Sequence, residues 1–207
     1  MILTDNGGTT FEQPPIGSHI ARCIRLIDIG TQKGEYQGLP TFKRQLILAW
    51  ELPGELMTAG DFAGKPFTVS KFYTASLHEK SGLRKDLAAW RTRDFTDEEL
   101  KGFDPKVLIG KPCMVSIGLT EKGKAKVNAV MALPKGMTVP NQVNPALHFS
   151  LDDFNEATFN ALSDGYKKLI SASPEYHQIQ NPHPVEEQRK PVAAGSGFDD
   201  MDDDIPF

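Results

Sequence analysis

The sequence predicts a mainly β protein with a few short helices, in the α+β class. Stretches rich in β-branched residues recur between Gly and Pro positions along residues 17–132, and such stretches are typical of strands separated by turns. One stretch near residues 83–90 has the 3.6-residue period of a helix instead. From residue 174 onward the chain is polar and its apolar residues follow no period, which is typical of a segment outside the folded core.

Three strands are predicted before the helix. The first covers residues 19–29 and ends at Gly30, and the second covers residues 41–51 and ends before a Pro-Gly pair. The third covers residues 66–74. Residues 33–40, between the first two strands, contain two glycines and a proline, so we expect a loop there.

A helix follows the third strand. Leu83, Leu87 and Trp90 stand at positions i, i+4 and i+7 and form one apolar helix face. Two residues compete to begin this helix: Ser76, which has a Glu three residues later in capping-box spacing, and Ser81.

A second short helix and two more strands complete this region. Thr96 and Glu99 have capping-box spacing and predict a helix that ends near residue 102. Strands are expected at residues 112–119 and 125–132, joined by a hairpin turn at residues 120–124. The predicted order is therefore β-β-β-α-β-β. This is the element order of the OB-fold, a five-stranded barrel with a helix between strands three and four, although other small α+β folds also fit.

We expect five segments along the chain: a flexible N-terminus over residues 1–13, the OB-fold domain over residues 14–137, a helical extension packed on the barrel over residues 138–173, a disordered linker over residues 174–197, and an acidic tip over residues 198–207. The extension contains two helical segments, at about residues 152–162 and 164–171. Helices of this length are marginal alone, so we expect both to pack on the barrel.

The composition excludes several classes of protein. The chain is 39% hydrophobic and 24% charged, as in ordinary globular domains. We expect no membrane-spanning helix, because no run of about 18 apolar residues is present, and the first residues lack the pattern of a signal peptide. Cys23 and Cys113 make neither a disulfide framework nor a zinc pattern. These features favour a cytoplasmic protein.

The net charge of −4 hides an uneven distribution. Residues 14–133 carry 18 Lys+Arg and 13 Asp+Glu, a net charge of +5, whereas residues 197–207 carry −5. A basic body with an acidic end points to a polyanionic partner and to a tail with a separate role.

No enzymatic motif is present, and we expect neither catalysis nor a cofactor or metal. The sequence lacks a phosphate-binding GxxxxGK[ST] loop, an HExxH zinc motif and a GxSxG elbow. Its five histidines are scattered. Asp28, Glu51, Asp61 and Asp86 have no spacing that argues for the metal site of a nuclease.

The last residues are the most specific signal, and they read Asp202-Asp203-Asp204-Ile205-Pro206-Phe207. Charge runs usually keep a tail in solution, but such a tail has no need to end on three apolar residues. A partner can bind a Phe ring and carboxylates together, in an apolar pocket rimmed by Arg or Lys. This segment is similar to the C-terminal tip of bacterial single-stranded DNA-binding proteins, which also follows a linker. The resemblance covers about nine residues and implies binding to replication, recombination and repair proteins.

The body resembles a different group. Proteins encoded by phages and mobile elements, described as single-stranded DNA-binding proteins, are similar over roughly residues 17–180. The resemblance is carried by Lys71-Phe72-Tyr73-Thr74-Ala75-Ser76-Leu77-His78-Glu79-Lys80, Leu83-Arg84-Lys85-Asp86-Leu87 and Trp90-Arg91. It implies a phage or prophage protein with a host-type tip, acting in the host cytoplasm at the nucleoid. It leaves open whether the chain forms a homo-oligomer such as the bacterial homotetramer.

Sequence-tolerant binding of a single strand needs cations for phosphates and aromatic faces for bases. In an OB-fold, strands two and three and the first and last hairpin loops surround the binding face. The candidate contacts with single-stranded DNA in these places are Arg22, Lys33, Tyr36, Phe42, Lys43, Arg44, Lys71, Tyr73, Lys122 and Lys124.

Alternation along the third strand places Lys71 and Tyr73 on one face and Phe72 on the other. One of these two aromatic residues is therefore expected in the core, and we assign Tyr73, beside Lys71, to DNA. Trp50 and Trp90 are expected to be packing residues.

Other candidates keep two interpretations. Phe42 lies near the end of its strand and fits either the core or a binding face. Lys122 and Lys124 fit a solvated turn equally well.

These observations predict a non-catalytic protein that coats single-stranded DNA and recruits host or phage DNA-processing proteins through its tip. One alternative is an adaptor or competitor that occupies such proteins with little DNA affinity of its own, and another is a recombination mediator. The opposite charges of body and tail also predict that the tail folds back on the basic groove when DNA is absent.

Overall fold

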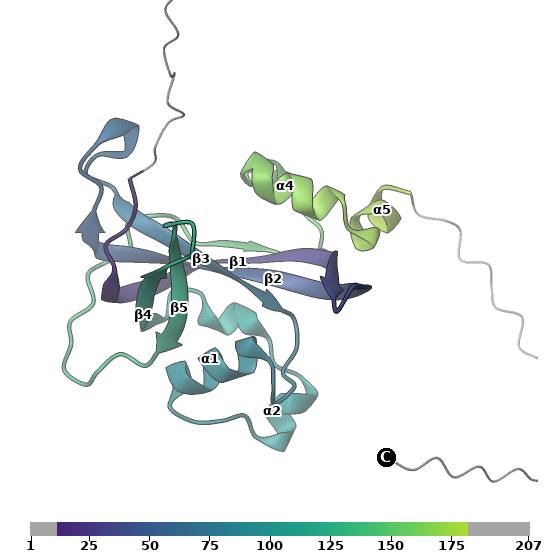
Figure 1. Ribbon diagram of the computed structural model, residues 1–207, viewed down its shortest axis with the longest axis horizontal. Coiled ribbons are helices and arrows are strands. Elements are labelled where there is room, and N and C mark those ends of the chain that lie inside the picture. Colours follow the sequence, from purple (N-terminus) through teal and green to yellow (C-terminus); the bar gives the residue numbers. More distant parts are fainter. Residues whose placement is uncertain (1–11, 182–207) are drawn as a thin grey trace, which may run out of the picture.

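The structure is a computed structural model that describes residues 12–181. It contains one six-stranded sheet in the order β3-β2-β1-β4-β5, antiparallel throughout except that β6 pairs in parallel with β1 (Figure 1). The strands are β1 (Gly17–Tyr36), β2 (Leu39–Leu56), β3 (Pro66–Thr74), β4 (Pro112–Leu119), β5 (Ala125–Met131) and β6 (Leu147–Phe149). The helices are η1 (Gly60–Phe62), α1 (Gly82–Arg91), α2 (Asp97–Lys101), η2 (Pro105–Leu108), α3 (Glu156–Asn160), α4 (Asp164–Ser171) and α5 (Pro174–Gln180).

The sheet is open between its edge strands β3 and β5, so no hydrogen-bonded barrel closes within the described residues. The Cα atoms of β3 and β5 approach to within 8 Å, and Lys71 Nζ on β3 donates a 2.9 Å hydrogen bond to the Asn128 carbonyl on β5. Asn128 lies at a bulge, where the pairing of β5 with β4 shifts by one residue. A bulge disrupts the local ladder, so the edge of β5 offers no regular row of backbone groups to β3.

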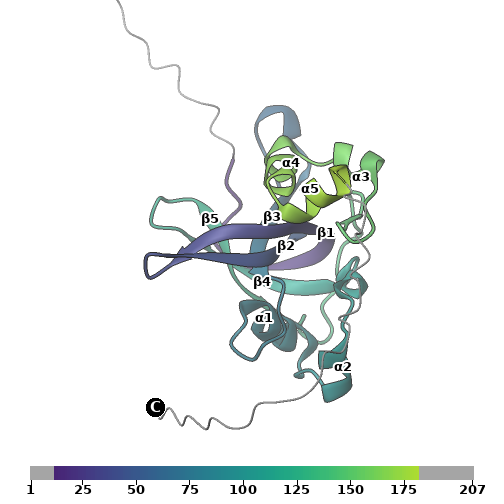
Figure 2. The same cartoon turned by 90° about the vertical axis from the view of Figure 1, so that its right-hand side faces the viewer.

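Residues 33–40 are not the loop that the sequence predicts. They form the end of a long β1–β2 hairpin that projects from the rest of the molecule (Figure 2), with only Gln37 and Gly38 in the turn. Both turn residues have positive φ, 50° and 77°, as the turn type that matches strand twist requires. Pro40 is tolerated because a two-stranded arm leaves one edge of each strand unpaired.

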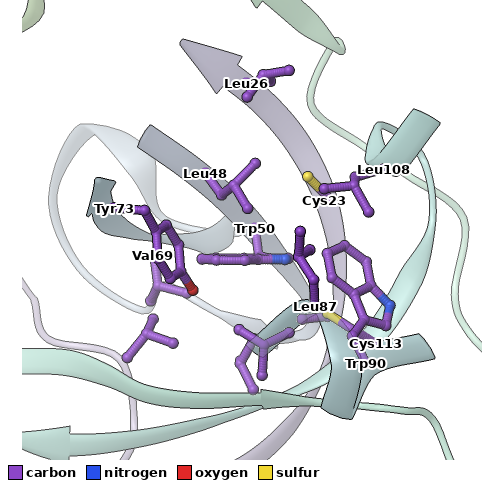
Figure 3. Close-up of a cluster of buried hydrophobic side chains, with 14 of the residues drawn as sticks. Cys23, Leu26, Leu48, Trp50, Val69, Tyr73, Leu87, Trp90, Leu108 and Cys113 are labelled. Atoms are coloured by element: carbon purple, nitrogen blue, oxygen red, sulfur yellow. The ribbon is translucent and has the colours of Figure 1, made fainter. Parts of the chain in front are cut away.

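One face of the sheet packs on α1 and forms what we call the inner core. It joins apolar side chains of β1 to β5 with Leu83, Leu87 and Trp90 of α1. Trp50 lies at its centre, between Tyr73 and Trp90 (Figure 3). The centroids of the indole rings of Trp50 and Trp90 are 6.4 Å apart. Trp50 and Trp90 are thus packing residues, as predicted.

The opposite face of β1 and β2 carries a second cluster, the outer core, beneath α3, α4 and α5. Ile27, Ile29 and Ile47 of the strands meet Phe149 and Ile170 of the C-terminal part. This explains why residues 46–50 are all apolar and buried, because a strand covered on both faces shows no alternation. α4 and α5 lie on one side of the sheet and α1 and α2 on the other (Figure 2).

The segment expected to be a disordered linker from residue 174 begins as helix α5. Ser173 caps this helix by accepting a 3.2 Å hydrogen bond from Tyr176 N, and Pro174 occupies the first turn, where its missing N–H is harmless. Glu175 accepts hydrogen bonds from the backbone and hydroxyl of Thr31 at 2.9 and 2.6 Å. The rest of the expected linker and the tip lie outside the described residues.

Gly30 is a close contact between β1 and α5. Its φ is +70°, and a Cβ there would lie 2.6 Å from both Cβ and Oγ of Ser173. Gly30→Ala is expected to lower the free energy of unfolding by about 2 kcal/mol or more, since it combines backbone strain with a clash. Gly38→Ala is the matched control, because Gly38 has φ +77° but no atom within 4 Å. Urea unfolding of both variants separates the contribution of backbone strain from that of the clash with Ser173. Equal losses of unfolding free energy in the two variants would contradict the packing of α5 on Gly30.

The contacts of Glu99 in the first turn of α2 make the folding stability depend on pH. Hydrogen bonds from the Arg93 guanidinium and from the Thr96 backbone N–H lower the pKa of Glu99 to about 2. A carboxyl with a lowered pKa stabilises the folded chain above its unfolded pKa, and this contribution disappears as the pH falls through the folded pKa. Glu99→Gln should therefore be less stable than wild type at pH 6, and the difference should shrink towards pH 2, as urea midpoints would measure. A constant difference would contradict this ion pair.

Candidate nucleic-acid interface

Three of the cations predicted to contact DNA are engaged within the fold. Arg22 donates hydrogen bonds to the carbonyls of Gly110 and Pro140, at 2.8 and 3.2 Å. Arg44 bridges Asp28 and Asp152, and the hydrogen bond with Asp28 raises the pKa of Arg44. These contacts tie neighbouring loops and strands together. Carboxylates compensate the charge of Arg44, whereas Arg22 is held only by backbone carbonyls and keeps its positive charge.

Lys71 and Tyr73 both contact the carboxylate of Asp86. Lys71 Nζ lies 2.6 Å from Asp86 Oδ2 on α1, and Tyr73 Oη donates a 2.6 Å hydrogen bond to the same oxygen. Tyr73 is only 5% exposed, and burial together with Asp86 raises its pKa. Tyr73 therefore offers little exposed ring surface for a base to stack on, although it contributes to the lining of the groove described below. Phe72, which the prediction placed in the core, is 50% exposed.

The projecting hairpin keeps four of the predicted residues at the surface. Tyr36 and Phe42 are each 65% exposed. Lys33 and Lys43 are exposed and make no ion pair among the residues described. Lys33 stands opposite Phe42 in the register, so a cation and an aromatic ring lie side by side on one face of the hairpin.

A groove of about 610 Å³ opens where β3 ends, between the hairpin and the first turn of α1. Its lining includes Lys43, Phe72, His78 and Lys80. Phe72, His78 and Lys80 were not among the predicted site residues, although all three lie in the stretch that carries the resemblance to phage proteins. The groove brings an exposed ring together with two lysines that make no ion pair within the described chain.

Lys122 and Lys124 lie in the exposed turn between β4 and β5. The turn is closed by a backbone hydrogen bond of 2.9 Å from Gly123 N to the Thr120 carbonyl. Neither lysine lines the groove, so the structure does not bring them together with the other candidates.

Glu51 and the two cysteines are buried inside the fold. Glu51 is fully buried and accepts hydrogen bonds from the loop before β6. Cys23 and Cys113 are unpaired and buried, and burial raises the pKa of Cys23 to about 12. Within residues 12–181, no three His, Cys, Asp or Glu side chains are placed to hold a metal ion. None of the helices in that range has the length and apolar character needed to cross a bilayer.

Comparison of the chain with protein-family models and with curated proteins finds no match in either.

Proposed function

We propose that this protein binds single-stranded DNA without sequence specificity during replication, recombination or repair, and recruits partner proteins through residues 202–207. The observation that carries the proposal is the groove at the end of β3, where exposed Phe72 lies among Lys43, Lys80 and His78. Such a role would place the protein on DNA in the cytoplasm of a bacterial host.

The groove and the hairpin offer the two kinds of contact that a single strand needs. Bases can stack on Phe72 and, along the hairpin, on Tyr36 and Phe42, and each stacked base contributes about 1–3 kcal/mol. Phosphates can pair with Lys33, Lys43 and Lys80. Lys43 joins the two regions, because it lines the groove and directly follows Phe42 on β2. Stacking on a ring accepts every base, so we expect little sequence preference.

We further propose that the sheet is an OB-fold barrel opened at one seam. The order β3-β2-β1-β4-β5 is that of the barrel when β3 and β5 are separated, and Lys71 spans this gap by its contact with Asn128. Strands two and three form the binding face of that fold. Here α4 and α5 cover the outer face of β1 and β2, which leaves the end of β3 and the hairpin as the accessible part.

Titration of a fluorescein-labelled oligothymidylate with the full chain tests the proposal by anisotropy. Binding is expected at 50 mM salt and should weaken steeply at 200 mM, because each neutralised phosphate releases counterions. A labelled strand is preferable to intrinsic fluorescence, since Trp50 and Trp90 are both buried. Absence of binding at the lower salt concentration would refute the DNA-binding role.

Deletion of Phe207 distinguishes the proposed DNA-binding role from the alternative in which the protein is an adaptor. A DNA-binding protein with a recruiting tip should keep or increase its affinity for oligothymidylate after this deletion. An adaptor would have little affinity for oligothymidylate with or without Phe207, and the loss of its interaction with host DNA-processing proteins would be the only change.

A further inference from the structure

A second hollow lies on the side of the molecule opposite to α4 and α5, where α1 ends. This pocket has a volume of about 570 Å³ and is enclosed by α1, the segment that precedes β4, and the chain that follows β5. Its apolar walls are Trp90, Phe103, Val107, Leu108 and Leu133. It shares no lining residue with the groove at the end of β3, so the proposed DNA contacts leave it vacant.

The charged residues in the pocket lining are all basic. They are Arg91, Lys111 and Lys135, and no carboxylate lines the pocket within the described residues. An apolar floor with a basic rim fits a ligand that carries apolar side chains and carboxylates together.

Arg91 supplies an independent sign of an anionic ligand. Its guanidinium stacks on the rings of Phe95 and Phe103, 4.4 and 5.5 Å from their centres, and pairs with Glu99 through Nη2. The other terminal nitrogen, Nη1, is buried and has no hydrogen-bond partner among the described residues. A buried charged donor without a partner is costly. Arg91 belongs to the lining of the pocket, so a carboxylate bound there is a candidate partner for this donor.

We infer that this pocket binds the Asp-Asp-Asp-Ile-Pro-Phe segment, residues 202–207, of the same chain. The segment has the matching chemistry: Ile205 and Phe207 fit the apolar walls, and its aspartates fit Arg91, Lys111 and Lys135. The chain is also long enough. The 26 residues that follow Asn181 can span roughly 85 Å when extended, whereas a folded domain of this size is only about 40 Å across.

Two consequences distinguish this docking from simple charge attraction. The segment occupies a pocket separate from the groove, so it can stay docked while DNA binds. Opposite charges alone would instead place the tail on the basic groove, where it would compete with DNA. A partner protein must displace the segment from this pocket before binding it. The inference does not depend on DNA binding and stands or falls separately from it.

Photo-cross-linking of the full chain tests the inference. p-Benzoylphenylalanine replaces Phe207, and the cross-links formed at low protein concentration are mapped by mass spectrometry. We expect cross-links within one chain to the apolar walls of the pocket, with Val107 and Leu133 among the targets. Excess synthetic peptide of residues 199–207 should suppress them, which tests the pocket without changing the body.

Charge reversal at the rim provides the second arm. Lys111→Glu with Lys135→Glu should lower the cross-linking yield about tenfold. The matched control is Lys85→Glu with Lys168→Glu, which reverses two exposed lysines outside the pocket and should leave the yield unchanged. Cross-links to the groove around Phe72 and Lys80, cross-linked dimers, or a yield insensitive to the peptide would each overturn the inference.

Discussion

Replacement of Glu51 by Ala is expected to lower the free energy of unfolding by about 3–5 kcal/mol. Glu51 lies on β2 with no exposed surface. Its carboxylate accepts three hydrogen bonds from the loop before β6: 2.9 Å from Val143 N, and 2.6 Å from both the backbone N and the side-chain Nδ2 of Asn144. The Ala variant leaves these donors unpaired and empties a buried site. Guanidinium chloride unfolding at pH 7 measures the loss.

Two further variants show whether the carboxylate is responsible. Glu51→Gln should be intermediate, because it keeps the size of the side chain but places an NH₂ group against a donor. Glu55→Ala is the matched control on the same strand, where the acid is partly exposed and pairs with His19, and it should cost less than about 1 kcal/mol. A Glu51→Ala variant within 1 kcal/mol of wild type would show that the loop is held by other contacts.

Phe72→Ala is expected to weaken binding of single-stranded DNA by about 5- to 150-fold, the equivalent of about 1–3 kcal/mol for one lost stacking platform. The ring is half exposed and lines the groove beside Lys43 and Lys80, so its removal should leave the inner core intact. Anisotropy titration with labelled oligothymidylate at low salt gives the affinity, and the unfolding midpoint verifies that the fold is unchanged.

Neighbouring aromatic residues provide the controls for Phe72. Tyr73→Phe removes the hydroxyl that is bonded to Asp86, and this variant should lose stability while keeping its DNA affinity. Phe62→Ala removes a ring with a similar exposure, 49%, outside the groove, and it should leave the affinity unchanged. If Phe62→Ala weakens binding as much as Phe72→Ala, the binding face lies elsewhere on the molecule.

The sequence predicts strands well where local signals are complete. β3 and β4 have the predicted bounds, because each run of β-branched and aromatic residues starts at a proline and ends at a change of pattern. Ser81 caps α1 through Leu83 N, which settles the choice between Ser76 and Ser81. The hairpin at residues 33–40 was missed because Gln-Gly is a weaker turn signal than Asn-Gly. β6 was missed because its three residues are too few to show a period.

The candidate site was harder to predict, because charge compensation acts through space. Alternation separates Phe72 from Tyr73, but it cannot say which face is covered until α1 brings Asp86 to Tyr73. Lys71 and Arg44 look like free cations in the sequence, yet their acids lie 15 or more positions away along the chain. Phe72, His78 and Lys80 form a groove only because the loop after β3 turns back over the strand end.

The double coverage of β1 and β2 constrains how this protein can be shortened or fused. Truncation of the chain before residue 147 would expose Ile27, Ile29 and Ile47, because the side chains that cover them would be lost. Exposed apolar strand surfaces of this kind promote aggregation. The C-terminal helices therefore form part of the folded domain, and we expect that they cannot be removed without exposing the outer core. Tags, fluorophores or surface tethers placed after residue 181 leave both cores covered, and they should keep residues 202–207 accessible.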